Sequence, residues 1–256
     1  MKLGMTSLTL RECEIENVIK HAKEAGLKGI EWGVCEKHVS LDNNNNVEKI
    51  KRLSKESGIE IFSLGSYCYM EKIEECEKNI KTAILLNAPV IRVWAGVKAP
   101  SDCDDAYIKT IVSNTRYMAD IAKEHGIKIG FEYHNHSLTE NAESAINLIK
   151  KIDRENVGLY WQPNHILSVM ENIKERKAVL PYCVGNLHIQ NFTPEEGYKA
   201  LEEISDALSL YFGDIKNENY NLMIEFVKDN TPENLIKDAK QLKKCLINKE
   251  YKNEKY

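Results

Sequence analysis

The sequence predicts a single (β/α)8 barrel, an α/β fold in which eight parallel strands alternate with eight helices. A Lys-Glu-x-Gly motif occurs three times, at residues 23–26, 55–58 and 123–126, and a short apolar segment follows each copy. The three glycines are separated by 32 and by 68 positions, and the second spacing is close to twice the first. A strand and helix unit of about 32 residues fits eight times into the 256 residues of the chain.

Each copy of this motif predicts the end of one helix and the beginning of the next strand. Lys and Glu close an amphipathic helix, and the glycine takes the left-handed position just beyond it, which is costly for a residue with a Cβ. The apolar residues that follow begin a strand. Eight strands are expected on this basis, at Leu3–Leu8, Gly29–Trp32, Ile59–Leu64, Val90–Trp94, Ile127–Glu132, Val157–Trp161, Val184–Ile189 and Leu222–Phe226.

Helical patterns occupy the segments between these strands. Apolar residues recur at steps of three and four, for example at Ile15, Val18, Ile19 and Ala22, which is typical of a helix that packs one face on a core. No Pro-rich or Ser-rich linker divides the chain. We therefore expect one barrel domain over residues 1–247 and a polar C-terminal tail over residues 248–256.

Composition restricts the class of protein and its partners. Hydrophobic residues make up 43% of the chain and charged residues 29%, which is typical of a globular protein with a sizeable core. A formal net charge of −4 argues against a broad basic surface for nucleic acid or membrane, so a small molecule is the expected partner. No apolar window reaches the length of a membrane span. The oligomeric state is left open, with a homo-oligomer among the alternatives.

The cysteines and the N-terminus favour a cytoplasmic location. The chain contains 7 Cys and no Cys-x-x-Cys pair, which argues against a zinc ribbon or a redox motif. We expect free, mostly buried thiols in a reducing compartment. Residues 1–10 lack the apolar core and the cleavage site of a signal peptide.

Polar side chains cluster at the ends of the last four expected strands. The fifth strand leads into Glu132, His134 and His136. Because side chains alternate between the two faces of a strand, these three point to the same side. Gln162 and His165 follow the sixth strand. In parallel barrels the catalytic groups project from the carboxyl ends of strands, so a metal site is expected where these side chains meet. The residues that the seventh and eighth strands contribute are His188 and Glu225.

The order and spacing of four segments resemble the xylose-isomerase-like TIM barrel superfamily of sugar isomerases and epimerases. These segments are Gly29–Gly33, Glu132–His136, Leu187–Ile189 and Ile224–Phe226. The resemblance covers essentially the whole chain. It implies one divalent metal ion, with Mn²⁺, Mg²⁺, Co²⁺ and Zn²⁺ as alternatives, held by ligands from strands five to eight. The implied ligands are Glu132, Gln162, His188 and Glu225.

One implied ligand departs from the pattern of the superfamily. Most relatives have Asp where this chain has Gln162, whose amide oxygen can bind a hard cation but carries no charge. Two carboxylates would then balance a divalent ion, and we expect weaker metal binding and a more electrophilic ion.

Such a site suits proton abstraction beside a carbonyl. A bound cation would stabilise an enediolate, while Glu132 and Glu225 remove the proton and return it during isomerisation or epimerisation of a small sugar or polyol derivative. The expected substrate contacts are His165, His136, His134, Trp94 and Trp161, although packing beneath the loops is the alternative for the tryptophans.

Several alternatives stay open or are disfavoured. Acidic loops after strands seven and eight favour an unphosphorylated substrate. Arg92 either pairs with Glu31 or binds an anionic substrate. An inosose-type dehydratase begins with the same proton abstraction, and a noncatalytic sugar-binding barrel is a third class. Endonucleases of the superfamily that act at abasic sites are disfavoured, because four ligands suffice for one metal only and no basic groove is expected.

Overall fold

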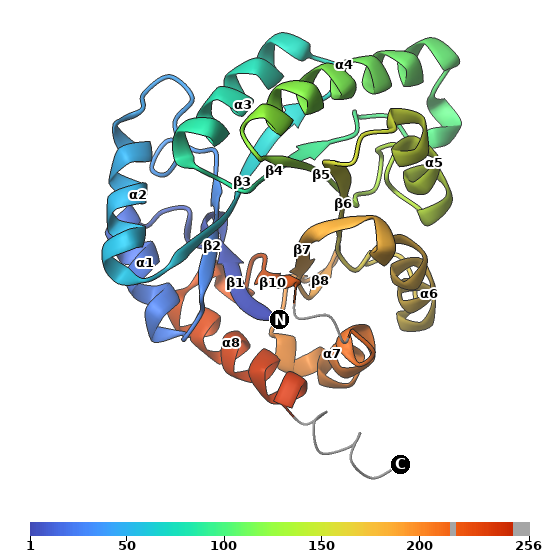
Figure 1. Cartoon of the computed structure of the whole chain (residues 1–256). Coiled ribbons are helices and arrows are strands. Elements are labelled where there is room, and N and C mark those ends of the chain that lie inside the picture. The colour runs from blue at the N-terminus through green and yellow to red at the C-terminus, as the bar shows by residue number, and fades with distance from the viewer. Residues whose placement is uncertain (216–218, 248–256) are drawn as a thin grey trace.

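Eight parallel strands close into one barrel in this computed structural model, which describes residues 1–215 and 219–247. The order around the barrel is β1, β10, β7, β6, β5, β4, β3, β2, so the first and last strands pair and close it (Figure 1). The predicted fold class is confirmed. The bounds of the strands are β1 Lys2–Thr6, β2 Gly29–Gly33, β3 Glu60–Tyr69, β4 Val90–Trp94, β5 Lys128–Glu132, β6 Val157–Trp161, β7 Cys183–Ile189 and β10 Asn221–Ile224.

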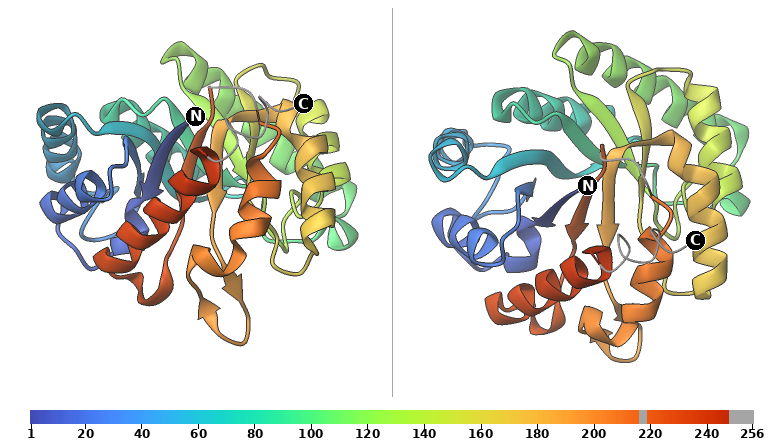
Figure 2. Two further views of the ribbon diagram at one scale, coloured as in Figure 1. Left: turned by 90° about the horizontal axis from the view of Figure 1, so that it is seen from below. Right: turned by 60° about the horizontal axis from the view of Figure 1, so that its bottom comes forward.

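Helices surround this barrel on the outside (Figure 2). The main core is formed by the apolar residues that face outward from the strands and inward from the helices. The bounds of the helices are α1 Ile15–Glu24, α2 Asn45–Ser57, α3 Ile73–Leu86, α4 Asp105–Glu124, α5 Ala142–Ile152, α6 Val169–Val179, α7 Ser205–Phe212 and α8 Pro232–Ile247. The predicted tail, residues 248–256, lies outside the described residues.

The Lys-Glu-x-Gly motifs mark the joints between helices and strands, as expected. Gly26, Gly58 and Gly126 have φ of 66°, 71° and 69°, the left-handed conformation that glycine adopts without steric cost. The backbone N–H of Gly58 also binds the carbonyl of Ser54 in the last turn of α2. A local sequence signal therefore sets where three of the strands begin.

A small second core fills the barrel interior toward the amino ends of the strands. It comprises Phe62, Val90, Tyr160 and Met223, with Val184 packed against them. The Phe62 ring reaches across two neighbouring strands, and a Cβ added at Gly29 would lie 2.2 Å from that ring. Gly29 therefore leaves space for the Phe62 ring, and nothing in the local sequence around either residue indicates this contact. The polar residues of the interior lie beyond this apolar layer, toward the carboxyl ends of the strands.

Some boundaries differ from the predicted ones for local reasons. The first strand ends at Thr6, because residues Ser7–Leu10 form a 3-10 helix (η1). The last strand ends at Ile224, and Phe226 has a φ of 59° that an extended strand cannot accommodate. Two short strands, β8 (Phe192–Thr193) and β9 (Gly197–Tyr198), form an unpredicted hairpin that projects from one end of the barrel (Figure 2).

The prediction that all cysteines are free thiols is wrong for one pair. Cys68 near the end of β3 and Cys76 in α3 form a disulfide, with Cα atoms 5.2 Å apart. Sequence spacing of eight residues gave no sign of it, because the chain reverses direction between strand and helix. The free cysteines of the described residues are Cys13, Cys35, Cys103, Cys183 and Cys245. Within the same residues, no helix combines the length and the apolar character that a membrane span requires.

Candidate metal centre

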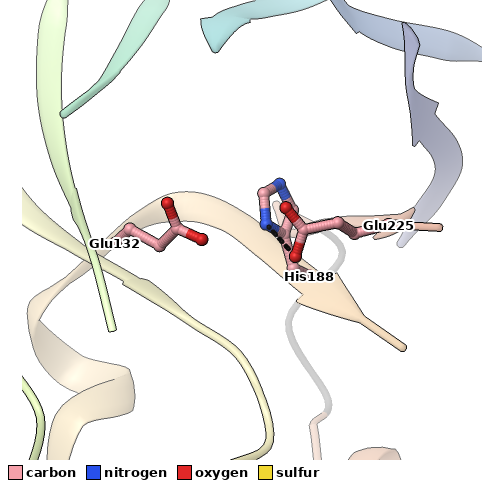
Figure 3. A group of neighbouring side chains, drawn as sticks. All are labelled: Glu132, His188 and Glu225. Carbon is pink, nitrogen blue, oxygen red and sulfur yellow. Dashed lines mark ion pairs between the residues drawn. The ribbon is translucent and has the colours of Figure 1, made fainter. Parts of the chain in front are cut away.

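Glu132, His188 and Glu225 meet at the carboxyl end of the barrel. Glu132 is the last residue of β5, His188 lies in β7, and Glu225 directly follows β10. One potential ligand atom from each of the three lies within 4.8 Å of the other two (Figure 3). All three side chains are buried. Strands far apart in the sequence thus deliver two carboxylates and one imidazole to a single point.

The hydrogen-bond ladder of the barrel sets the positions of two of these residues. Met223 of β10 lies opposite His188 of β7, and the N–H of Glu225 binds the carbonyl of Ile189 at 2.9 Å. The ladder therefore extends one residue past the end of β10. It holds the backbone of Glu225 in register beside His188, so that their side chains face the same interior.

His188 lies between two carboxylates without making a well-aligned hydrogen bond. Its Nδ1 is 3.3 Å from Oε2 of Glu225, and its Nε2 is 3.4 Å from Oε1 of Glu31. Both ring nitrogens are buried, and within the described residues neither has a hydrogen-bond partner of acceptable geometry. A buried nitrogen without a partner is costly, and the nitrogen on the side of Glu225 is suited to bind a cation.

Carboxylates shift the titration of the imidazole and of each other. Burial disfavours the charged imidazole, but Glu225 and Glu31 outweigh burial and raise the pKa of His188 to about 10. Burial raises the pKa of Glu132, and Arg92 only partly opposes it. Burial acts on Glu225 in the same direction, yet the adjacent His188 outweighs it and lowers the pKa of that carboxyl. The two carboxyls of the centre therefore differ in their affinity for a proton.

Arg92 joins the centre to a second buried carboxylate. Its Nε is 2.9 Å from Oε1 of Glu31, which confirms the predicted pairing of these two residues. Its Nη1 also donates to Oε2 of Glu132, a contact that the sequence did not reveal. Oε2 of Glu31 accepts hydrogen bonds from Ser63 at 2.8 Å and from the Tyr160 hydroxyl at 2.9 Å. Every charge in this network has a partner, as burial requires.

Gln162, which stands where most members of the superfamily have Asp, lies next to Glu132. Its Nε2 donates to Oε1 of Glu132 and to the backbone carbonyl of Tyr133, both at 3.1 Å. Its Oε1 accepts a hydrogen bond from Gln190 at 3.2 Å. The amide nitrogen of Gln162 thus faces the carboxylate of the centre.

The predicted substrate contacts have different surroundings. The His134 ring lies against Trp94, with centroids 4.2 Å apart, and both side chains are half-buried. His136 and His165 are exposed. Trp161 is fully buried and packs edge-on against Tyr211 of α7, so the structure corrects its predicted substrate contact in favour of packing beneath the helices. Period two accounts for this, because Trp161 faces outward while Gln162 faces inward.

A polar cavity of about 500 Å³ adjoins the centre between the loops that follow β5 and β6. Gln162 and Gln190 line it on the side of the metal centre. The remaining polar lining comes from imidazole, amide and carboxylate groups, including His134, His136 and His165, and among the described residues no Lys or Arg contributes to it. Three predicted contacts thus share one cavity of the size that small ligands occupy.

A parallel barrel with carboxylates and an imidazole at the carboxyl ends of its strands is typical of metal-binding barrel enzymes. The chain belongs to the xylose isomerase-like TIM barrel family, whose family model matches residues 19–244.

Three proteins illustrate what the chain is similar to. It is 22% identical to 3-dehydroshikimate dehydratase of Bacillus anthracis over 249 residues, covering 90% of this chain and 88% of that protein. It is 29% identical to 2-oxo-tetronate isomerase of Pectobacterium atrosepticum over 140 residues, covering 50% of this chain and 53% of the relative. The crystal structure of a D-tagatose 3-epimerase-like protein superposes with a TM-score of 0.80 at 18% identity, covering 98% of this chain and 99% of the other.

A divalent cation fits the residues present at the centre. Two carboxylates and an imidazole form a donor set of a kind common to divalent metal sites, and their negative charge equals the charge of the ion. Nδ1 of His188, the ring nitrogen that faces Glu225, is buried and has no well-aligned hydrogen bond within the described residues, so it is a suitable ligand atom for a cation.

Proposed function

We propose that this protein is a divalent-metal-dependent isomerase or epimerase that acts on a small sugar or polyol derivative. The main supporting observation is that Glu132 at the end of β5 and Glu225 after β10, two strands separated in the barrel by β7 and β6, converge on one point with His188 beside them. A divalent ion bound there would stabilise negative charge that develops on the substrate oxygen. The match to 2-oxo-tetronate isomerase over half of the chain supports this class of reaction.

In this proposal the two carboxylates move the proton. In the metal-free protein their pKa values shift in opposite directions: His188 favours the ionised form of Glu225, which can accept a proton, whereas burial favours the protonated form of Glu132. Glu225 removes the proton beside the carbonyl, and Glu132 supplies one to the other face or to the neighbouring carbon. His134 and His165 orient substrate hydroxyls in the polar cavity, and Trp94 supports His134.

A dehydratase is the second candidate, favoured by the match to 3-dehydroshikimate dehydratase over most of both chains. It would begin with the same removal of a proton by Glu225 and end with loss of water instead of return of the proton. The part of the chain that the structure describes contributes no Lys or Arg to the cavity lining, which favours a substrate region rich in hydroxyl groups over one carrying a phosphate.

Exchange of substrate hydrogen with deuterated water tests the proposal. We expect the metal-loaded protein to exchange a hydrogen beside the carbonyl of at least one compound in a panel of free ketoses, sugar acids and keto-polyols. Glu225→Gln should abolish exchange and keep the fold, whereas Glu155→Gln, on the exposed outer surface, should leave exchange unchanged. Product mass separates rearrangement from loss of water. Exchange that survives both chelation and Glu225→Gln would refute the proposed chemistry.

A further inference from the structure

We propose that Gln162 is a hydrogen-bond donor that positions Glu132, and that the metal is held by three protein ligands instead of four. This inference rests on the proposed metal site and concerns how that site is built. It replaces the role that the family resemblance implies for this position, in which the side chain contributes an oxygen to the ion.

The orientation of the Gln162 amide follows from its neighbours. Nε2 lies 3.1 Å from the backbone carbonyl of Tyr133, and a carbonyl oxygen can only accept a hydrogen bond. The same nitrogen lies 3.1 Å from Oε1 of Glu132, a second acceptor. A reversed amide would place its oxygen against two acceptors in a buried setting, so the N–H groups must face Glu132.

The other end of the amide is also held. Oε1 of Gln162 accepts from Nε2 of Gln190 at 3.2 Å, and Gln162 is only 5% exposed. Turning this oxygen toward an ion would break all three hydrogen bonds. It would also leave the Tyr133 carbonyl without this donor in the interior, where an unpaired polar group costs about 1 to 3 kcal/mol.

Glu132 is consequently fixed from both sides. Gln162 binds its Oε1 and Arg92 binds its Oε2. A carboxylate oxygen has two acceptor positions, so each can still bind a cation while keeping its donor. Gln162 therefore orients a metal ligand without being one. The ion keeps one more position for water or substrate than it would with four protein ligands.

Counting the water molecules on bound Mn²⁺ tests this inference. Broadening of the Mn²⁺ electron paramagnetic resonance lines in ¹⁷O-enriched water reports the number of bound waters. If Gln162 is a donor only, Gln162→Ala leaves the number unchanged, and Gln162→Glu lowers it by one, because a carboxylate repelled by Glu132 turns to the ion. If Gln162 is a ligand, Gln162→Ala gains one water and Gln162→Glu changes nothing, and the inference is wrong.

A second measurement uses the metal-free protein. The side-chain NH₂ resonance of Gln162, assigned by its loss in Gln162→Ala, should shift strongly in Glu132→Ala and only weakly in Gln190→Ala. The reverse pattern would overturn the assigned orientation. If the wild-type protein binds none of Mn²⁺, Mg²⁺, Co²⁺ and Zn²⁺, the proposed function and the three-ligand site both fail. A water gained by Gln162→Ala on a bound ion overturns only the present inference.

Discussion

Arg92 is the residue on which the buried charges of the barrel depend. It contacts Glu31 and Glu132, and the side chains of all three are at most 4% exposed. Burial disfavours its charge, but the surrounding carboxylates outweigh burial and raise its pKa well above the usual value. A cation in this position lets the barrel carry more carboxylates than a divalent ion could neutralise alone.

Replacing Arg92 should therefore destabilise the fold strongly. Arg92→Met leaves two buried carboxylates without their cation, and loss of one partner of a buried ion pair typically costs about 3 to 5 kcal/mol. Arg52→Met removes an exposed pair with Glu56 and should cost less than about 1 kcal/mol. Urea unfolding of both variants measures the difference. Equal losses would mean that the buried network contributes no more than a surface pair.

The sequence offered the pairing of Arg92 with Glu31 as one of two alternatives, but it did not reveal the contact between Arg92 and Glu132 or the orientation of Gln162. Glu31, Arg92 and Glu132 lie 61 and 40 positions apart, so no local spacing connects them. The sequence did place Glu132, His188 and Glu225 at strand ends, because period two and the barrel order determine which side chains face inward. Which end of the Gln162 amide faces Glu132 depends on the Tyr133 carbonyl and Gln190, which only the folded chain brings into contact with it.

At the scale of the elements, the joints were readable because their signal is local. Glycine is favoured where φ is positive at the end of a helix, and the motif places one there in three copies. Asn87 and Asp153 adopt the same conformation at the ends of α3 and α5 without this signal. The disulfide between Cys68 and Cys76 and the hairpin formed by β8 and β9 depend on how loops fold back, so they were missed. The sequence therefore predicts the joints, where a single glycine sets the backbone conformation, better than it predicts contacts between distant residues.

Substitutions at two glycines distinguish the cost of a positive φ from the cost of steric crowding. At Gly58 a Cβ would meet no atom within 4 Å, but φ is 71°, so Gly58→Ala should cost about 1 kcal/mol. At Gly29 a Cβ would lie 2.2 Å from the Phe62 ring, so Gly29→Ala should cost about 2 to 3 kcal/mol through overpacking. Urea unfolding of the two variants, with wild type as reference, tests the order. A larger loss for Gly58→Ala would contradict the packing of Phe62 across the barrel.

Asp238 in α8 should make stability fall as pH rises. Burial raises its pKa to about 6, although its Oδ1 accepts the Leu201 N–H at 3.0 Å. The folded protein therefore holds this proton above pH values at which the unfolded chain has lost it, and stability declines between about pH 4 and pH 6.

Asp238→Asn keeps the acceptor and removes the charge. It should be more stable than wild type by about 1 kcal/mol at pH 8, with the gain fading toward pH 4. Asp42→Asn changes a side chain that is 86% exposed and is the matched control, for which we expect no such pH dependence. Thermal unfolding across this pH range measures both variants. A gain for Asp238→Asn that is the same at pH 4 and pH 8 would contradict the assignment to this carboxyl.

For the whole molecule, the barrel unites segments that the sequence separates. β1 pairs with β10, so the two ends of the described barrel lie side by side (Figure 1). The candidate metal centre draws on β5, β7 and the residue after β10, and its proposed ligands therefore exist as a set only in the closed barrel. An ion bound to all three should stabilise the folded chain as a whole, because the unfolded chain offers no such set.

Metal binding should accordingly raise the melting temperature of wild type. An ion at 100 times its dissociation constant contributes about 2.7 kcal/mol, which corresponds to a rise of roughly 5 to 10 °C for a domain of this size. Glu225→Gln weakens a ligand and should lose most of the rise, whereas Glu155→Gln should retain it. Calorimetry with Mn²⁺ and with chelator measures each case. An equal rise in Glu225→Gln would place the bound ion elsewhere on the protein, since the stabilisation would then not depend on Glu225, which follows the strand β10 that closes the barrel.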